Sequence, residues 1–412
     1  MTSNLTDLTV GALDPALHDL YGQYNFSGDY EPDAVTDSPP STHYWGAAEL
    51  NTFSNWYRHY HGFIAAIVCV FGIIANGFNV IILTQRNMQS ATNFILTALA
   101  VSDGLTMAAY FPFALYYYCI YGPDASPTRD TQGAAYFLLF YVFWSVVMHS
   151  ISIWLTVTLA LFRYIFIKYP PRGATVCSMQ RAKLAVFLTV LATAIVLIPN
   201  YISHKVECFP ASNVTNRTGE IHTVILAKKT ETEIIIFSVT FWVTAILVKL
   251  LPCAMLTVLS ILLVRCMQEA EKRRIKLRNQ SKLIQREGDD DRSDRRTNRT
   301  TRMLLAVVVL FLICELPQGL LNLLSGLLPT FYEDISSPLG DLLDILALFN
   351  NGINFILYCT MSKQFRDTFC AVFLKPVQVR HSENGRGRFT LVPNNNSVAN
   401  TATTMVTRTS DV

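Results

Sequence analysis

The sequence predicts an all-α membrane protein, a bundle of seven transmembrane helices with a short amphipathic eighth helix. Of its 412 residues, 51% are hydrophobic and only 15% are charged, which is too apolar for an ordinary soluble domain. Seven separate apolar stretches each provide the ~20 residues that cross a bilayer as a helix. The formal net charge of only +3, spread along the chain, argues against a nucleic-acid partner, which requires a concentrated basic face.

Three regions are expected along the chain. Residues 1–58 are polar, acidic and turn-rich, which predicts a disordered extracellular tail. Residues 59–374 form the membrane domain and its amphipathic helix. Residues 375–412 are rich in Ser, Thr and Asn and predict a disordered cytoplasmic tail. Because the N-terminus lacks the basic start and apolar core of a cleavable signal peptide, the first span is expected to direct insertion.

The seven spans are expected at residues 59–83, 91–116, 134–167, 181–202, 233–266, 302–328 and 338–358. After the last span, apolar residues recur at helical spacing at Phe365, Phe369, Val372 and Phe373, which predicts a short helix along the inner leaflet. Cys370 in this segment is either a palmitoylation site or a free buried thiol.

Basic residues indicate which loops face the cytoplasm. The loop after the fifth span carries Lys and Arg at both ends, at 272–282 and 295–302, and the loop after the third span carries Lys168 and Arg172. Such loops stay in the cytoplasm, so the N-terminus is expected outside a multi-pass plasma-membrane protein. Four glycosylation sequons then face outward, at Asn4, Asn25, Asn213 and Asn216.

Polar and proline motifs mark the spans in a fixed order. They are Asn76, Leu99-Ala100-Val101-Ser102-Asp103, Arg163-Tyr164 with Pro170, Pro252, Cys314 with Pro317, and Asn354 with Tyr358. In this order they resemble the rhodopsin-like G-protein-coupled receptors over roughly residues 59–374. Within that family, the run 158–165 and especially Glu315-Leu316-Pro317-Gln318-Gly319 look like the insect myosuppressin and FMRFamide-related peptide receptors.

The resemblance implies a receptor for an extracellular neuropeptide, such as a myosuppressin ending in Arg-Phe-amide, that activates heterotrimeric G proteins. Arrestin, receptor kinases and membrane lipid are the other partners that it implies. A receptor for another peptide or small molecule, or a seven-helix transporter, is the alternative. An amine receptor is disfavoured because Ser145 stands where such receptors have an aspartate. No zinc-protease, nucleophile-elbow or phosphate-loop motif indicates an enzyme.

Several positions depart from the family pattern. Phe162 stands where the family has an acid before Arg163, so the ion pair that restrains this arginine at rest is missing. Glu315 replaces the usual tryptophan of the sixth span, and Phe355 replaces the usual proline before Tyr358. Activation is therefore expected to use altered contacts.

The family's outer disulfide also lacks its usual partner. No cysteine occurs at the start of the third span, while Cys208 remains in the second outer loop. Cys119, just past the second span, is the nearest outward candidate to pair with it. Two free thiols are the alternative.

A polar set is expected around Asp103, because an ionised carboxylate inside the membrane needs partners. By resemblance, Ser152, Asn350 and Asn354 converge on it to form an oxygen-rich sodium pocket, with no other cofactor implied. A hydrogen-bonded network without an ion is the alternative.

Lys249 and Glu315 are ionisable residues deep inside apolar spans, and neither can easily face lipid. By resemblance they meet at the floor of a ligand pocket, where a peptide's basic group competes for Glu315 or for Asp344; a purely structural ion pair is the alternative. Further pocket candidates are Ser145, Met148, His149, Gln318 and Asn322, with Trp144, Phe241 and Trp242 as aromatic walls. For His149, a buried core histidine is the competing interpretation.

The inner ends of the spans are expected to contact the G protein. By resemblance, Arg163, Tyr164 and Tyr358 form this contact together with the basic ends of the third inner loop. Basic runs that merely bind water or anionic lipid are the alternative.

Overall fold

The computed structural model describes residues 44–211, 218–227, 230–281, 290–328 and 330–374, and the structural statements below concern these ranges. The four expected glycosylation sites, Asn4, Asn25, Asn213 and Asn216, lie outside the described residues. So do most of the expected N-terminal tail and the whole C-terminal tail, residues 375–412.

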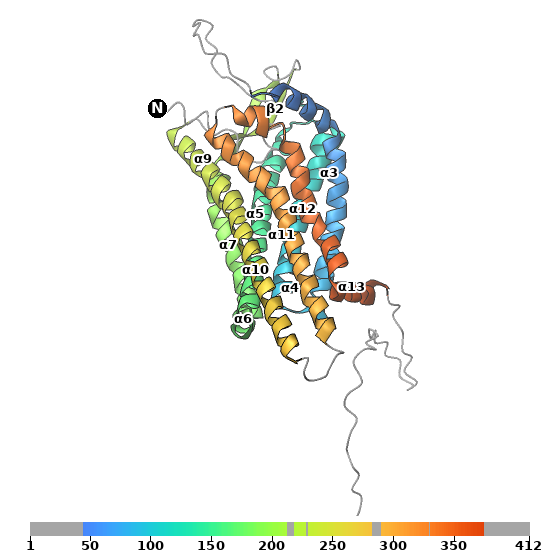
Figure 1. Cartoon of the computed structure of the whole chain (residues 1–412). Coiled ribbons are helices and arrows are strands. Elements are labelled where there is room, and N and C mark those ends of the chain that lie inside the picture. Colours follow the sequence, from blue (N-terminus) through green and yellow to red (C-terminus); the bar gives the residue numbers. More distant parts are fainter. Residues whose placement is uncertain (1–43, 212–217, 228–229, 282–289, 329, 375–412) are drawn as a thin grey trace, which may run out of the picture.

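Seven of the described helices are long and apolar enough to cross a membrane, and they pack side by side as a bundle (Figure 1). In chain order they are α3 (Ala47–Leu83), α4 (Ala91–Ala114) with η2 (Leu115–Ile120), α5 (Gln132–Lys168), α7 (Met179–Val196) with α8 (Ile198–Ile202), α9 (Glu231–Val243) with η4 (Thr244–Leu250) and α10 (Leu251–Ser281), α11 (Asp290–Leu327), and α12 (Gly340–Met361). Shorter helices are η1 (Arg86–Met88), α6 (Pro170–Val176) and η5 (Tyr332–Ser336). The predicted seven-helix bundle is confirmed.

The first helix begins earlier than expected. The 37 residues of α3 are about 55 Å long, well beyond the ~30 Å hydrocarbon core, so residues 47–58 extend the helix past one face of the bundle. The expectation of a disordered segment up to residue 58 is therefore wrong for this part. This segment contains many polar residues and forms no apolar run, so hydropathy did not predict it as part of the helix. The rings of Phe53 and Tyr57 pack with centroids 5.8 Å apart, which supports the helix here.

The residues before α3 are tied to the chain near α12. The Tyr44 ring packs edge-on against Phe331, and its backbone N–H donates to the Asp334 carboxylate at 3.1 Å. Asp334 is only 4% exposed. Glu333 beside it is exposed.

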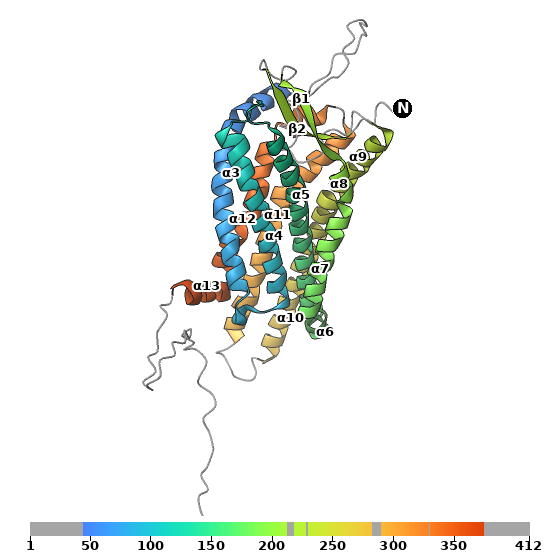
Figure 2. The ribbon, with the colours of Figure 1, turned by 180° about the vertical axis from the view of Figure 1, so that it is seen from behind.

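A two-stranded hairpin that the sequence analysis did not predict covers one end of the bundle (Figure 2). Strand β1 (His204–Pro210) pairs antiparallel with β2 (Glu220–Leu226), with Val206 opposite Val224. Val224 is fully buried against the helix bundle, so the hairpin is packed on the helices rather than free in solution. We call this the hairpin end of the bundle.

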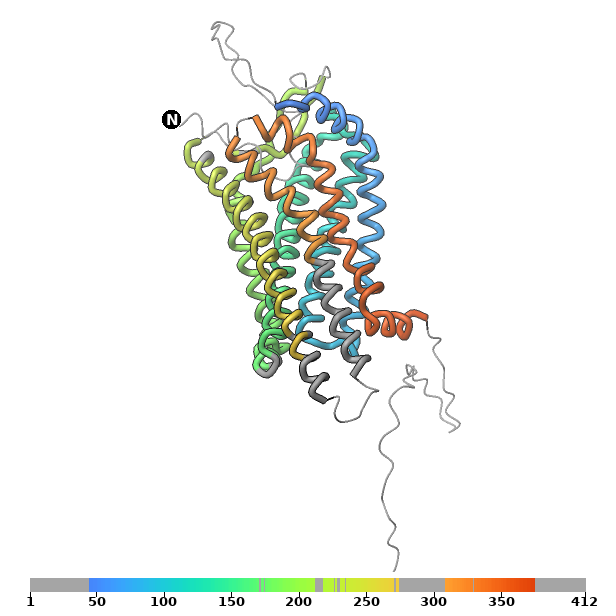
Figure 3. The backbone as a smooth tube through the Cα atoms, in the orientation of Figure 1, coloured from blue at the N-terminus to red at the C-terminus, as the bar shows by residue number. Residues whose placement is uncertain are grey.

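The opposite end carries a short helix that turns away from the bundle axis (Figure 3). The Ser362 side chain accepts the Phe365 N–H at 3.2 Å, which caps the start of α13 (Lys363–Phe369), and η6 (Cys370–Leu374) continues it. Phe365 is 1% exposed and packs against Tyr358 and Phe355. Cys370 is exposed at the end of α13. We call this the α13 end.

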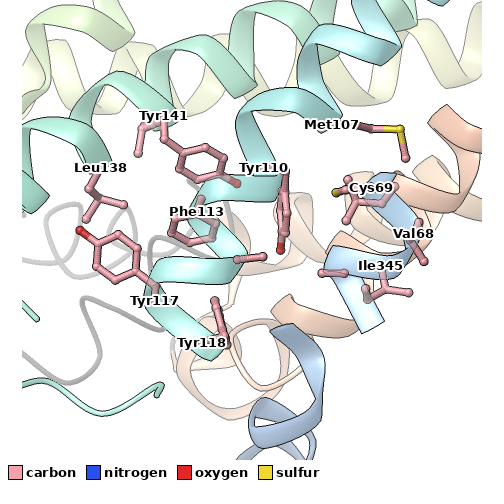
Figure 4. Close-up of a cluster of buried hydrophobic side chains, with 14 of the residues drawn as sticks. Val68, Cys69, Met107, Tyr110, Phe113, Tyr117, Tyr118, Leu138, Tyr141 and Ile345 are labelled. Carbon is pink, nitrogen blue, oxygen red and sulfur yellow. The ribbon is translucent and has the colours of Figure 1, made fainter. Parts of the chain in front are cut away.

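Aromatic side chains from α4, η2 and α5 form the core at the hairpin end (Figure 4). Phe113 and Tyr141 stack with ring centroids 4.1 Å apart and planes 5° apart. Tyr110 and Tyr118 meet the Phe113 ring at steep angles, an arrangement that aromatic quadrupoles favour. This cluster fixes the position of α4 against α5 and thereby one wall of the pocket described below.

Phe113→Ala is expected to lower the unfolding free energy of the purified protein by at least about 2 kcal/mol, because a fully buried ring leaves a cavity. Thermal unfolding in detergent micelles measures the loss. Phe187→Ala, at a ring 62% exposed on α7, is the matched control and should change the unfolding temperature little. Equal losses in the two variants would contradict this account of the core.

Candidate functional site

A pocket open to solvent lies between α4, α5, η4, α11 and α12. Six of the seven expected ligand-binding residues line it: Ser145, His149, Lys249, Gln318, Asn322 and Asp344. The seventh, Glu315, lies beneath this surface and is 0% exposed. Met148, a further candidate, packs instead against a hydrophobic cluster near the α13 end.

Lys249 contacts three side chains at the floor of the pocket. Its Nζ donates to Glu315 Oε2 at 3.0 Å and to Gln318 Oε1 at 2.6 Å, and it lies 3.0 Å from His149 Nε2. His149 Nε2 is also 3.3 Å from Glu315 Oε2. A neutral Nε2 accepts from Lys249 and a protonated one donates to Glu315, so the imidazole can serve only one of them at a time.

The local backbone explains why Lys249 points inward. It lies in η4, a π-helical stretch that ends just before Pro252, which has no N–H to donate to the preceding turn. This wider turn brings the segment close to α11, where a Cβ on Gly319 would lie 3.5 Å from the Lys249 Cβ. The bulge and the glycine together place the ammonium group over Glu315.

Glu315 is a fully buried carboxylate, and only one of its two oxygens forms hydrogen bonds with described residues. Oε1 has no hydrogen-bond partner among the described residues, so the charge depends on the contacts of Oε2. Burying two charges costs several kcal/mol per ion, and their attraction offsets that cost only with good geometry. An incoming ligand reaches Glu315 only if Lys249 moves.

Asp344 is the acid that lines the pocket, and a chain of polar contacts holds it. Tyr110 Oη donates to Asp344 Oδ2 at 3.1 Å, and His61 Nε2 lies 2.8 Å from the same Tyr110 oxygen. His61 lies 3.8 Å from Asp341, which accepts from Tyr118 at 2.9 Å. The contacts run from α3 through α4 to α12, so they couple the pocket acid to three helices.

The aromatic walls differ from those expected. Trp144 donates its indole N–H to the Leu105 carbonyl at 3.2 Å, and Phe241 and Trp242 pack edge-on against each other beside Gly326. None of these three lines the pocket, so that expectation is wrong. The walls come instead from Tyr110 and Tyr141, with Thr106, Thr244 and Asn351 as further lining residues that sequence reasoning missed.

Two of the three residues expected around Asp103, Ser152 and Asn354, contact it, and Asp103 is 1% exposed. Ser152 Oγ donates to Asp103 Oδ1, and Asn354 Nδ2 donates to Oδ2 at 3.1 Å. Asn350 is half-buried, and no hydrogen bond joins it to Asp103 within the described ranges. Its neighbour Asn351 instead accepts from Asn76 through its backbone carbonyl at 3.0 Å. Carboxylate, hydroxyl and amide oxygens are suitable ligands for a hard cation.

At the α13 end, Arg163 stands beside a small cavity lined by α5, α10 and α11. It lies near enough to Tyr358 and Cys177 for electrostatic interaction, and no carboxylate lies within 4.0 Å of it in the described part of the chain. The ion pair that would restrain Arg163, which Phe162 at the preceding position cannot form, is therefore not replaced by another acid among the described residues. Tyr358 is buried and Tyr164 is half-buried on the same end.

The expected link between Cys119 and Cys208 is not formed, since both are free thiols. The Cys119 sulfur faces α3, where a Cβ added at Gly62 would lie 3.1 Å from it. Cys208 instead lies on β1 near Glu220 and His222. Their different neighbours explain why the cross-link expected from position along the chain is absent.

Comparisons with known proteins agree with this architecture. The profile of the family described as serpentine type 7TM GPCR chemoreceptor Srw matches residues 63–376. The chain is 31% identical over 359 residues to G-protein coupled receptor dmsr-1 of Caenorhabditis elegans, covering 79% of this chain and 70% of that protein. It is 30% identical over 328 residues to the sex peptide receptor of Drosophila melanogaster, covering 76% and 72%. The FMRFamide receptor of the same fly is 24% identical over 326 residues, covering 76% and 54%.

The fold, the motif positions and these similarities define a seven-helix signalling receptor of the membrane. The chain belongs to the seven-transmembrane G-protein-coupled receptor family, in its rhodopsin-like class, and lies among receptors for neuropeptides. Members of this family are signalling receptors, not enzymes.

Lys249→Met is expected to destabilise the receptor by about 3–5 kcal/mol, because it leaves the Glu315 carboxylate buried without its cation. The double variant Lys249→Met with Glu315→Leu should recover much of that loss. Unfolding temperatures in lipid nanodiscs provide the double-mutant cycle. Additive losses from the two substitutions would mean that the pair is not coupled.

Proposed function

We propose that this receptor binds an extracellular neuropeptide ending in Arg-Phe-amide, such as a myosuppressin, and activates heterotrimeric G proteins. The observation that carries the proposal is Asp344, an acid inside a pocket whose walls include Tyr110 and Tyr141. A guanidinium and a carboxylate form strong, geometrically specific paired hydrogen bonds. The phenyl ring of the peptide would pack against the tyrosine walls.

The orientation of the chain is part of the same proposal. The hairpin end faces the extracellular solution, where the peptide enters, and the α13 end faces the cytoplasm of a cell that carries the receptor in its plasma membrane. The Lys and Arg residues after the fifth span support this orientation.

Activation is proposed to pass through the Lys249 cluster at the floor of the pocket. A peptide that attracts the Gln318 amide or displaces the Lys249 ammonium weakens the contacts between η4 and α11. Pro317 lies in α11 close to these contacts, at a point where a helix can bend. A shift of α11 would open the α13 end, where Arg163, Tyr164 and Tyr358 would contact the G protein, and then arrestin and receptor kinases.

Cells that express the receptor are expected to signal in response to peptides ending in Arg-Phe-amide and to respond at least about tenfold less to the free acids, because a new carboxylate would repel Asp344. Asp344→Asn should lower the potency of the amide by about tenfold or more, since it removes a charged partner. G-protein activation after stimulation, with surface expression measured in parallel, gives both potencies.

Replacing the peptide arginine with the uncharged citrulline tests the contact itself. The replacement should lower potency strongly on the unchanged receptor and weakly on Asp344→Asn, as expected when both changes remove one interaction. Glu333→Gln, at an exposed acid near the same end, is the matched control and should keep its potency within about twofold. Equal citrulline effects in all three receptors would place the arginine elsewhere, and silence toward the amides would rule out this ligand class.

We also propose that Asp103, Ser152 and Asn354 hold a sodium ion when the receptor is inactive. Peptide affinity should then fall as sodium replaces a large organic cation at constant ionic strength, because sodium stabilises the state that binds peptide less well. Asp103→Asn should abolish this dependence in membrane binding assays. A sodium effect of the same size in that variant would leave the three residues as a hydrogen-bonded network only.

A further inference from the structure

The hairpin carries a group of metal-ligand side chains that the pocket does not use. Cys208 on β1 lies directly opposite His222 on β2, and Glu220 lies two residues before His222 on the same strand. Because side chains alternate between the faces of a strand, these three side chains share one face of the hairpin. Cys208 and Glu220 are exposed and His222 is half-buried, so ions in solution can reach the group.

The backbone brings the cysteine and the histidine close together. The His222 N–H donates to the Asp130 carbonyl at 2.9 Å, so it points away from β1. Cys208 and His222 therefore form a pair without direct backbone hydrogen bonds, the arrangement in which opposite side chains approach more closely. His222 Nε2 lies 3.9 Å from Glu220 Oε2, and one ligand atom from each of the three residues lies within 4.8 Å of the others.

We propose that Cys208, His222 and Glu220 form a binding site for Zn²⁺ on the hairpin. Thiolate, imidazole and carboxylate are the ligand types that zinc selects, and water completes the tetrahedron. Bonds of about 2.0–2.3 Å place two ligand atoms on a tetrahedral zinc ion about 3.3–3.8 Å apart. Side-chain rotations that move the ligand atoms by about an ångström bring them to this spacing. The hard cations Mg²⁺ and Ca²⁺ prefer sites made of oxygen alone.

The site also accounts for the unpaired cysteine in the hairpin. A free thiol carries a proton that a metal must displace, because the thiolate is the ligand. Zinc displaces that proton to the solvent and binds the thiolate. A bound ion would link β1 to β2. The expected disulfide would instead have linked Cys208 to Cys119 at the end of the second span. The hairpin packs on α5, which lines the ligand pocket, so the ion would stiffen one part of its entrance.

The test is the alkylation rate of Cys208 by a maleimide, measured by mass spectrometry of the purified full-length receptor in nanodiscs. Micromolar Zn²⁺ is expected to slow alkylation of Cys208 by about tenfold or more, while Mg²⁺ has no effect and the rate at the exposed Cys370 stays unchanged. His222→Ala and Glu220→Gln should each raise the Zn²⁺ concentration that gives half protection by about tenfold or more. Glu207→Gln, which alters the adjacent carboxylate on the opposite face of β1, is the matched control and should protect normally.

Three results would overturn the proposal. Cys208 that reacts equally fast with and without Zn²⁺ does not bind the ion. If Cys208 reacts with the maleimide only after reduction, and reacts without reduction in Cys119→Ser, then it is held in a disulfide and cannot bind a metal. Protection that persists in both His222→Ala and Glu220→Gln would likewise remove these residues from the site.

Discussion

A lysine and a glutamate buried against each other inside the membrane are the constraint on which this receptor depends. Lys249 and Glu315 are almost fully removed from solvent, so each charge needs the other, and neither helix can rotate without exposing one of them to an apolar surrounding. The π-helical turn before Pro252 and the small residue at Gly319 bring the two helices close enough for this contact. Glu315 Oε1 has no hydrogen-bond partner in the described part of the chain, so the pair is incompletely satisfied and can separate when the receptor changes state.

Two sets of polar contacts face each other across the pocket above this pair. Gln318 and His149 touch Lys249 from the pocket side, and Asp344 across the pocket is held by Tyr110 and through it by His61. Toward the α13 end, Arg163 has no acidic partner among the described residues, so the restraint on the resting state has to lie elsewhere. The buried pair is a candidate for that restraint, because it joins the fifth and sixth helices at the level of the pocket floor.

Apolar length was enough to predict the seven spans, because a span depends on length and composition. The six pocket residues were placed by the family resemblance that the ordered motifs carry. Features that depend on strand register or on side-chain packing could not be predicted from the sequence. The hairpin, whose pairing of Cys208 with His222 follows from strand register, has no signal in the spacing of the cysteines. The aromatic walls were misassigned because the rotation of each helix decides which rings face inward, and a π-helical stretch such as η4 changes that rotation. The helical start at Ala47 was missed because it is stabilised by packing and not by an apolar run.

The most direct test of the central claim is a structure of the receptor bound to an Arg-Phe-amide peptide and a G protein. The account predicts that the peptide guanidinium lies within hydrogen-bond distance of the Asp344 carboxylate and that Lys249 has separated from Glu315. A peptide that rests only on the hairpin, with the bond from Tyr110 to Asp344 and the bond from Lys249 to Glu315 both intact, would contradict it.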